Sequence, residues 1–115
     1  MSETMKCARG ALLETWSGHH WQDGIQLETI DDLTQLLVQT ENSLYEITVI
    51  CAHSGEILLR GGKFFPEYTP SRLAGSSLGG SFLKLRGIYV GFNMELYSEG
   101  RTIITSRVRM ITFEK

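Results

Sequence analysis

Residues 88–97 read IYVGFNMELY, and every even-numbered position in this stretch is apolar. A strict two-residue alternation is typical of a strand with one buried face and one solvent-facing face. Ser98-Glu99-Gly100 comes next and predicts a hairpin turn, with Gly100 suited to a positive φ. Residues 101–111, RTIITSRVRMI, would form the return strand. The sequence therefore predicts an antiparallel hairpin from about Ile88 to Ile111.

The alternation also predicts the two faces of this hairpin. The residues expected in the core are Ile88, Val90, Phe92, Met94 and Leu96, with Ile104, Val108 and Met110 on the return strand. The residues expected on the outer face include Tyr89, Asn93, Arg107 and Arg109. Any binding surface on the hairpin would lie on this second face.

Further strands are predicted upstream of the hairpin. Residues 44–51, LYEITVIC, are rich in β-formers and would bury Tyr45, Ile47, Val49 and Cys51. A turn at 53–55 leads to the returning strand EILLR at 56–60, and Gly61-Gly62 would permit a bulge or sharp bend. Residues 33–40 favour a strand over a helix that Asp31 or Asp32 would cap.

Residues 66–80, PEYTPSRLAGSSLGG, contain both prolines and four glycines, which predicts an irregular connection that begins at Pro66. Strand character returns at 82–85 and is interrupted by Arg86-Gly87. Short links between strands, without alternating helices, predict an all-β, mainly antiparallel fold. We expect a small barrel or sandwich of about six strands.

The 115 residues suit one domain, and the 42% hydrophobic content is ordinary for a globular chain. We expect residues 25–115 to form this domain and residues 1–24 to be an irregular segment packed on the core. Trp16 and Trp21 would cover one end of it. The start of the chain lacks the apolar run of a signal peptide, no window is apolar enough for a spanning helix, and there are two cysteines. These features predict a cytoplasmic protein.

Charge is divided unevenly along the chain. Residues 1–56 carry two basic and nine acidic side chains, whereas residues 57–115 carry nine basic and four acidic side chains. The two halves can neutralise each other, within one fold or across a dimer. Alternatively, the basic half presents a patch to an anionic partner.

The basic residues between 57 and 88 are interleaved with aromatic ones, a combination that binds single-stranded nucleic acid on small β-barrels. The glycine-rich loop at 75–81 adds backbone amides and hydroxyls that can cradle a phosphate, although it lacks the features of a P-loop. The candidate residues for a ligand or polyanion are Arg60, Lys63, Arg72, Ser76, Ser77, Lys84, Arg86, Tyr89, Arg107 and Arg109. The overall pI near 5.9 argues against a nucleic-acid partner.

Catalytic and metal chemistry receive little support. Cys51 and His53 are two residues apart, and Cys7, His19 and His20 would have to complete a zinc site, but these spacings match no compact ligand pair. No serine lies in a nucleophile-elbow motif, and Asp31-Asp32 is the only adjacent carboxylate pair. We therefore expect no catalytic residue, no metal and no cofactor. A metal-binding or hydrolytic enzyme remains the third alternative.

The segments TENSLYEI, RGGKFFPE, AGSSLGGSFLK and GIYVGFNMEL resemble segments that recur in small bacterial proteins of unassigned activity. This resemblance implies no named family and no functional residue. The sequence thus predicts a non-enzymatic β domain that binds a small ligand or a protein, which can be a second copy in a homodimer. The alternative is binding of single-stranded nucleic acid or another polyanion through residues 57–88. No membrane partner is expected.

Overall fold

The computed structural model describes residues 23–78 and 81–114 and is almost entirely antiparallel β-structure, which confirms the predicted fold class. The predictions for residues 1–22 and for Gly79-Gly80 lie outside the described residues. The elements are β1 (Gly24–Gln26), η1 (Leu27–Thr29), β2 (Gln35–Thr40), β3 (Leu44–Cys51), β4 (Glu56–Gly61), β5 (Phe65–Leu78), β6 (Ser81–Leu85), β7 (Gly87–Tyr89), β8 (Asn93–Ser98) and β9 (Arg101–Glu114). None of the described residues forms a helix long and apolar enough to cross a membrane.

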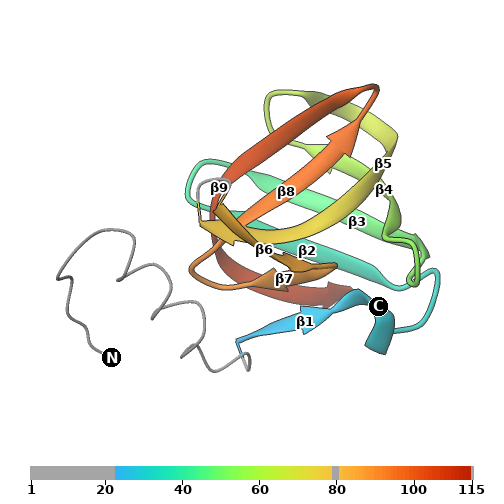
Figure 1. Ribbon diagram of the computed structural model, residues 1–115. Coiled ribbons are helices and arrows are strands. Elements are labelled where there is room, and N and C mark those ends of the chain that lie inside the picture. Colours follow the sequence, from blue (N-terminus) through green and yellow to red (C-terminus); the bar gives the residue numbers. More distant parts are fainter. Residues whose placement is uncertain (1–22, 79–80, 115) are drawn as a thin grey trace, which may run out of the picture.

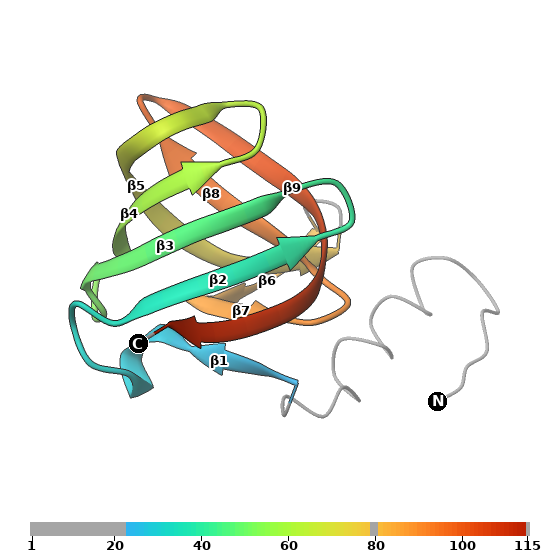
Figure 2. The ribbon, with the colours of Figure 1, turned by 180° about the vertical axis from the view of Figure 1, so that it is seen from behind.

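The strands close into a ring. Their order is β4-β3-β2-β9-β8-β5-β6, and β5 also pairs with β4, so that six strands form a small barrel with β6 added to β5. Closure satisfies the edge hydrogen bonds that an open sheet would expose. The short strands β1 and β7 form a separate sheet at one end of the barrel (Figures 1 and 2).

The predicted core faces of β3 and β8 are largely correct. Tyr45, Ile47 and Val49 are buried as expected from the alternation. Cys51 is only half-buried, because the β3–β4 register shifts between Val49 and Cys51 and turns Ala52 into the core instead. The even-numbered residues from 88 to 96 pack inward, with Ile88, Phe92, Met94 and Leu96 buried and Val90 partly buried.

The predicted core face of β9 is wrong at two positions. Ile104 and Met110 are 43% and 56% exposed, whereas Ile103 is buried and Val108 is buried as predicted. The cause is two register shifts in β9, one between Asn93/Glu95 in the β8 pairing and one between Gln39/Thr40 in the β2 pairing. Each shift places an extra residue in β9. Beyond it, positions that simple alternation assigns to the core point outward, and positions that it assigns to the surface point inward.

The predicted irregular stretch at 66–80 is also wrong over its first thirteen residues. Residues 65–78 form β5, a single long strand, and Pro66 does not end it. Both prolines lie in the half of β5 that pairs with β4 alone, and a proline is tolerated where one edge of a strand needs no N–H donor. The second half pairs with β8 on one side and with β6 on the other.

Tyr89 is buried, at 3% exposed, so its predicted position on the outer face is wrong. The chain turns at 90–92, with Gly91 at φ 94°, and this turn separates β7 from β8. The ring of Tyr89 then lies against Gly24 and Gly87, where any Cβ would overlap it. The alternation of apolar and polar residues continues through this turn in the sequence, but β7 and β8 belong to different sheets.

Candidate functional site

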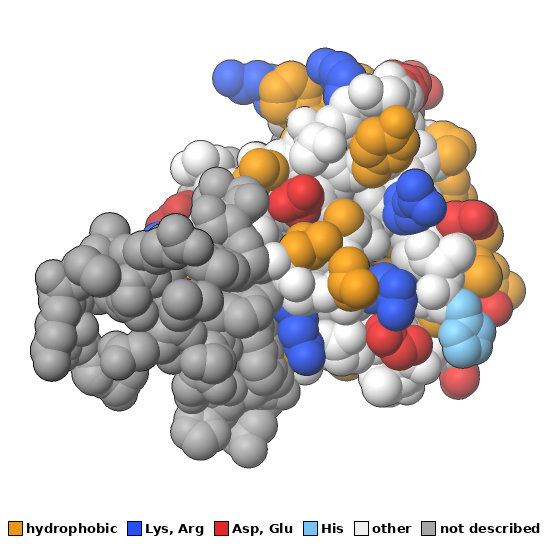
Figure 3. Space-filling view, viewed as in Figure 1, with side chains coloured by type: hydrophobic (Ala, Val, Ile, Leu, Met, Phe, Trp, Pro, Cys, Tyr) orange, Lys and Arg blue, Asp and Glu red, His pale blue; other side chains and the backbone are white. Residues whose placement is uncertain are grey.

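A surface cleft of about 300 Å³ lies where β5 passes from β4 to β8. Its lining includes Arg72 from β5, Glu95 and Tyr97 from β8, Leu85 at the end of β6, and Arg86 between β6 and β7. Figure 3 shows basic, acidic and hydrophobic side chains next to one another on this side of the barrel. The cleft therefore combines charged hydrogen-bonding groups with apolar contact area.

Gly55, in the turn between β3 and β4, lies next to both arginines of the cleft. A Cβ on Gly55 would lie 3.5 Å from the Cγ of Arg72 and 3.5 Å from the Cγ of Arg86. The two Cγ atoms are thus separated by no more than twice that distance. Gly55 adopts φ 82°, and its carbonyl accepts a hydrogen bond of 2.8 Å from the Leu73 amide, which ties this turn to β5.

The backbone of Arg86 is fixed in a conformation that is uncommon for a large side chain, with φ 54°. Its amide donates to the carbonyl of Ala74 at 2.8 Å, and its carbonyl accepts from the amide of Leu27 at 2.9 Å. Its Nη2 lies 3.3 Å from Oε2 of Glu28. Arg86 is therefore anchored by two separate segments of the chain, β5 and η1.

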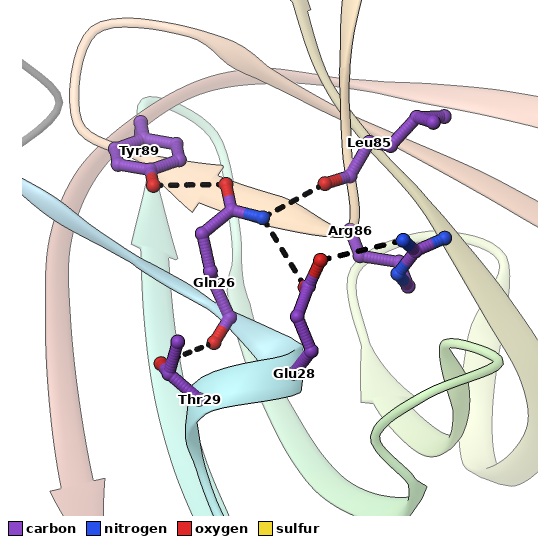
Figure 4. A network of polar contacts seen from close by, with 6 residues as sticks. All are labelled: Gln26, Glu28, Thr29, Leu85, Arg86 and Tyr89. Atoms are coloured by element: carbon purple, nitrogen blue, oxygen red, sulfur yellow. Dashed lines mark hydrogen bonds and ion pairs between the residues drawn. The ribbon is translucent and has the colours of Figure 1, made fainter.

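A polar network around Gln26 holds Glu28 in place for this ion pair (Figure 4). The Gln26 side-chain amide donates to Glu28 Oε1 at 3.2 Å and to the Leu85 carbonyl at 3.0 Å, and its Oε1 accepts from the Tyr89 hydroxyl at 2.9 Å. Burial alone would raise the pKa of the Glu28 carboxyl. A hydrogen bond with its own backbone, the Arg86 charge and the Gln26 hydrogen bond outweigh burial and lower that pKa.

Arg72 is exposed and, among the residues that the structure describes, it makes no ion pair. Its guanidinium lies 5.9 Å from the centre of the Tyr97 ring, its cross-strand neighbour on β8. Glu95 lines the same cleft and Glu56 is the neighbour of Arg72 on β4, but neither contacts the guanidinium as an ion pair. Arg72 thus keeps its hydrogen-bond donors available to a ligand.

Of the ten residues predicted as a binding site, Arg72 and Arg86 line this cleft. Arg60 lies on β4, where it pairs with Glu46 and sits 4.4 Å from the Tyr68 ring centre. Arg109 lines a second cleft, of about 370 Å³. The others are distributed over the fold: Lys63 is exposed in the β4–β5 turn, Lys84 is half-buried on β6, Arg107 is exposed on β9, and Ser76, Ser77 and Tyr89 are buried.

The hydroxyl of Ser76 joins two parts of the fold. Ser76 Oγ donates to the Gly87 carbonyl at 2.8 Å and accepts from the Tyr89 amide at 3.1 Å, so it joins β7 to β5. The sequence did not identify Glu95, Tyr97 or Leu85 as site residues. Alternation placed Glu95 and Tyr97 on the outer face, and this was the only signal for them.

Metal ligands do not gather in the described part of the chain. Across residues 23–78 and 81–114, no three histidine, cysteine, aspartate or glutamate side chains lie close enough together to hold a metal ion. Cys51 is half-buried and His53 is exposed in the turn after β3.

Fold and site together define a small antiparallel β-barrel with a basic and apolar surface cleft. No known protein family, no curated protein and no solved structure matches this chain. The geometry of the cleft and of the face around it is therefore the basis for assigning a function.

Proposed function

We propose that this domain is a recognition module that binds a protein partner through the outer face of β5, β6, β8 and β9. The observation that carries the proposal is a group of exposed apolar side chains around the cleft. Leu85, Tyr97 and Ile104 are 55%, 45% and 43% exposed. Leu85 and Ile104 lie on one cross-strand row of four strands, because Leu85 pairs with Gly75, Gly75 with Glu95, and Glu95 with Ile104.

Two physical arguments support this face as a contact surface. Tyrosine and arginine are the residue types that contribute most binding energy at protein interfaces, and both are present here in Tyr97, Arg72 and Arg86. The face is also built on paired strands of a closed ring, so that little conformational entropy would be lost when it binds.

Charge distribution favours a protein over a nucleic acid. A polyanion needs several cations in one field, because binding depends on the neutralisation of many phosphates. Here Arg60 is already paired with Glu46, Arg86 is paired with Glu28 through one nitrogen, and the carboxylate of Glu95 lines the cleft itself. A mixed surface of this kind suits a partner that carries both apolar and charged groups.

The partner can be a second copy of the chain. The described residues from 23 to 59 include no lysine or arginine but seven carboxylates, whereas the basic side chains lie from Arg60 onward. A second copy would bring one region against the other. Sedimentation at micromolar protein tests this form of the proposal, and a monomer at every concentration would restrict the partner to another protein.

A selection from a random-peptide display library tests the face itself. We expect peptides selected on the wild-type domain to lose binding to a Leu85→Ser, Tyr97→Ala double variant. A Leu44→Ser, Phe113→Ala double variant is the matched control, because these side chains are similarly exposed, at 47% and 51%, but lie on β3 and on the end of β9 that pairs with β2, outside the part of β9 that pairs with β8. Selected peptides that ignore the first variant, or that lose binding equally to both, would refute the proposal.

A further inference from the structure

The structure points to a carboxylate-binding site inside this face: we propose that Arg72 and Arg86 hold an aspartate, glutamate or C-terminal carboxylate of the partner. This inference rests on the proposed function and names the chemistry that the cleft recognises. It starts from two arginines that line one cleft and whose Cγ atoms both lie close to Gly55. Arg86 is paired with Glu28 through one of its terminal nitrogens, whereas Arg72 makes no ion pair with the described residues.

The two arginines differ in how they are held. Arg86 is fixed by its backbone hydrogen bonds and by Glu28, and its Nε is buried without a hydrogen-bond partner. A buried donor without a partner is unusual in a folded protein, and a ligand would satisfy the Arg86 Nε after a small rotation of the side chain that brings it to the cleft. Arg72 is exposed and lies within the same cleft, so it can move to meet an incoming anion.

A single carboxylate fits this cleft better than a phosphate. Guanidinium groups bind both anions through paired N–H donors. The cleft also contains the carboxylate of Glu95, which would repel a doubly charged phosphate more strongly than a singly charged carboxylate. The apolar side chains of Leu85 and Ile104 beside the cleft would contact the hydrocarbon part of an acidic peptide.

The nucleic-acid alternative uses the same arginines but predicts a different pattern. Binding of a polyanion would recruit exposed cations over a wide area, including Arg107 and Arg109 on β9. A carboxylate site depends on Arg72 and Arg86 in particular. Variants of single arginines therefore distinguish the two.

The direct test is an NMR titration of the arginine side-chain Nε–H signals at low ionic strength, with acetate in one arm and inorganic phosphate in the other. We expect acetate to shift the signals of Arg72 and Arg86 and to leave those of Arg101 and Arg109 unchanged. No shift at Arg72 and Arg86, or an equal shift at all four, would overturn the proposal. A tighter response to phosphate than to acetate would also overturn it.

The second test uses fluorescence anisotropy with labelled oligoglutamate and with labelled oligothymidylate of equal nominal charge. Arg72→Gln should weaken binding of oligoglutamate by about tenfold or more, as expected for a lost charge-assisted pair of hydrogen bonds. Arg72→Lys should restore part of it, and Arg109→Gln, a matched exposed arginine, should change it by less than about twofold. Circular dichroism confirms that each variant is folded.

The outcomes separate this inference from the proposed function. Oligothymidylate that binds more tightly than oligoglutamate, or equal losses in Arg72→Gln and Arg109→Gln, would assign the surface to a polyanion. Display-selected peptides that require Leu85 and Tyr97 but bind Arg72→Gln at full strength would leave the recognition face in place and remove the carboxylate site.

Discussion

Replacing Ser76 with alanine tests whether this hydroxyl belongs to the fold or to a ligand site. Ser76 is fully buried, and its Oγ makes hydrogen bonds of 2.8 and 3.1 Å with the Gly87 carbonyl and the Tyr89 amide. Ser76→Ala would remove both bonds while leaving the volume almost unchanged. Each bond lost by a buried polar group costs about 1–3 kcal/mol, so for two bonds we expect the free energy of unfolding to fall by roughly 2–6 kcal/mol. That is a large part of the roughly 5–15 kcal/mol typical of one domain.

The measurement is urea unfolding followed by far-ultraviolet circular dichroism, with Ser71→Ala as the control. Ser71 lies on the same strand and is only half-buried, and its hydroxyl makes one hydrogen bond, to the Thr69 carbonyl at 3.2 Å. We expect Ser71→Ala to cost less than about 1 kcal/mol. If Ser76→Ala cost no more than Ser71→Ala, the hydroxyl would not be joining β7 to β5, and a ligand role would become the better account of Ser76.

Three further changes test the geometry around the site. Gly75→Ala should prevent stable folding, because its Cβ would overlap the backbone of β6 at φ 152°, whereas Gly100→Ala has open space around it and should retain a cooperative thermal transition. The pKa of the Glu28 carboxyl is lowered in the fold, so its ion pair with Arg86 stabilises the fold above pH 4.5, and this stabilisation is lost as the pH falls below that value. When the free energy of unfolding is followed into acid, Glu28→Gln should therefore lose less stability than the wild type does. Arg60→Gln breaks an exposed ion pair and should lower the free energy of unfolding by less than about 1 kcal/mol. A larger loss, measured by urea unfolding, would contradict the surface position of Arg60.

Much of the fold can be predicted from residue alternation, because the inside and outside of a strand differ every second residue. This worked for Tyr45, Ile47 and Val49 on β3, and for Met94 and Leu96 on β8. It failed where an extra residue enters a strand, since a bulge depends on the partner strand as well as on local sequence.

The long strand β5 could not be predicted for a similar reason. Pro66 and Pro70 exclude a strand only if both of its edges need donors, and the topology leaves one edge unpaired in this half. The candidate site was partly predictable: the excess of basic residues between 57 and 88 identified Arg72 and Arg86 among ten candidate residues. Their common position beside Gly55 depends on a contact between a turn and β5 that no local pattern encodes.

The cleft and the closure of the barrel have one structural origin. β5 leaves β4 and joins β8 at Arg72, the one residue that pairs with both strands, and a register shift lies between Leu73 and Gly75. The amide of Leu73 and the carbonyl of Ala74 bond to the turn at Gly55 and to Arg86 instead of to a continuous ladder. A strand that changes partners must bend, and the bend hollows the outer face at the point where Arg72 emerges. The backbone at this point is therefore committed to closing the ring, whereas the Arg72 side chain takes no part in closure. For this reason we expect Arg72→Gln to leave the fold intact while it tests the proposed recognition site.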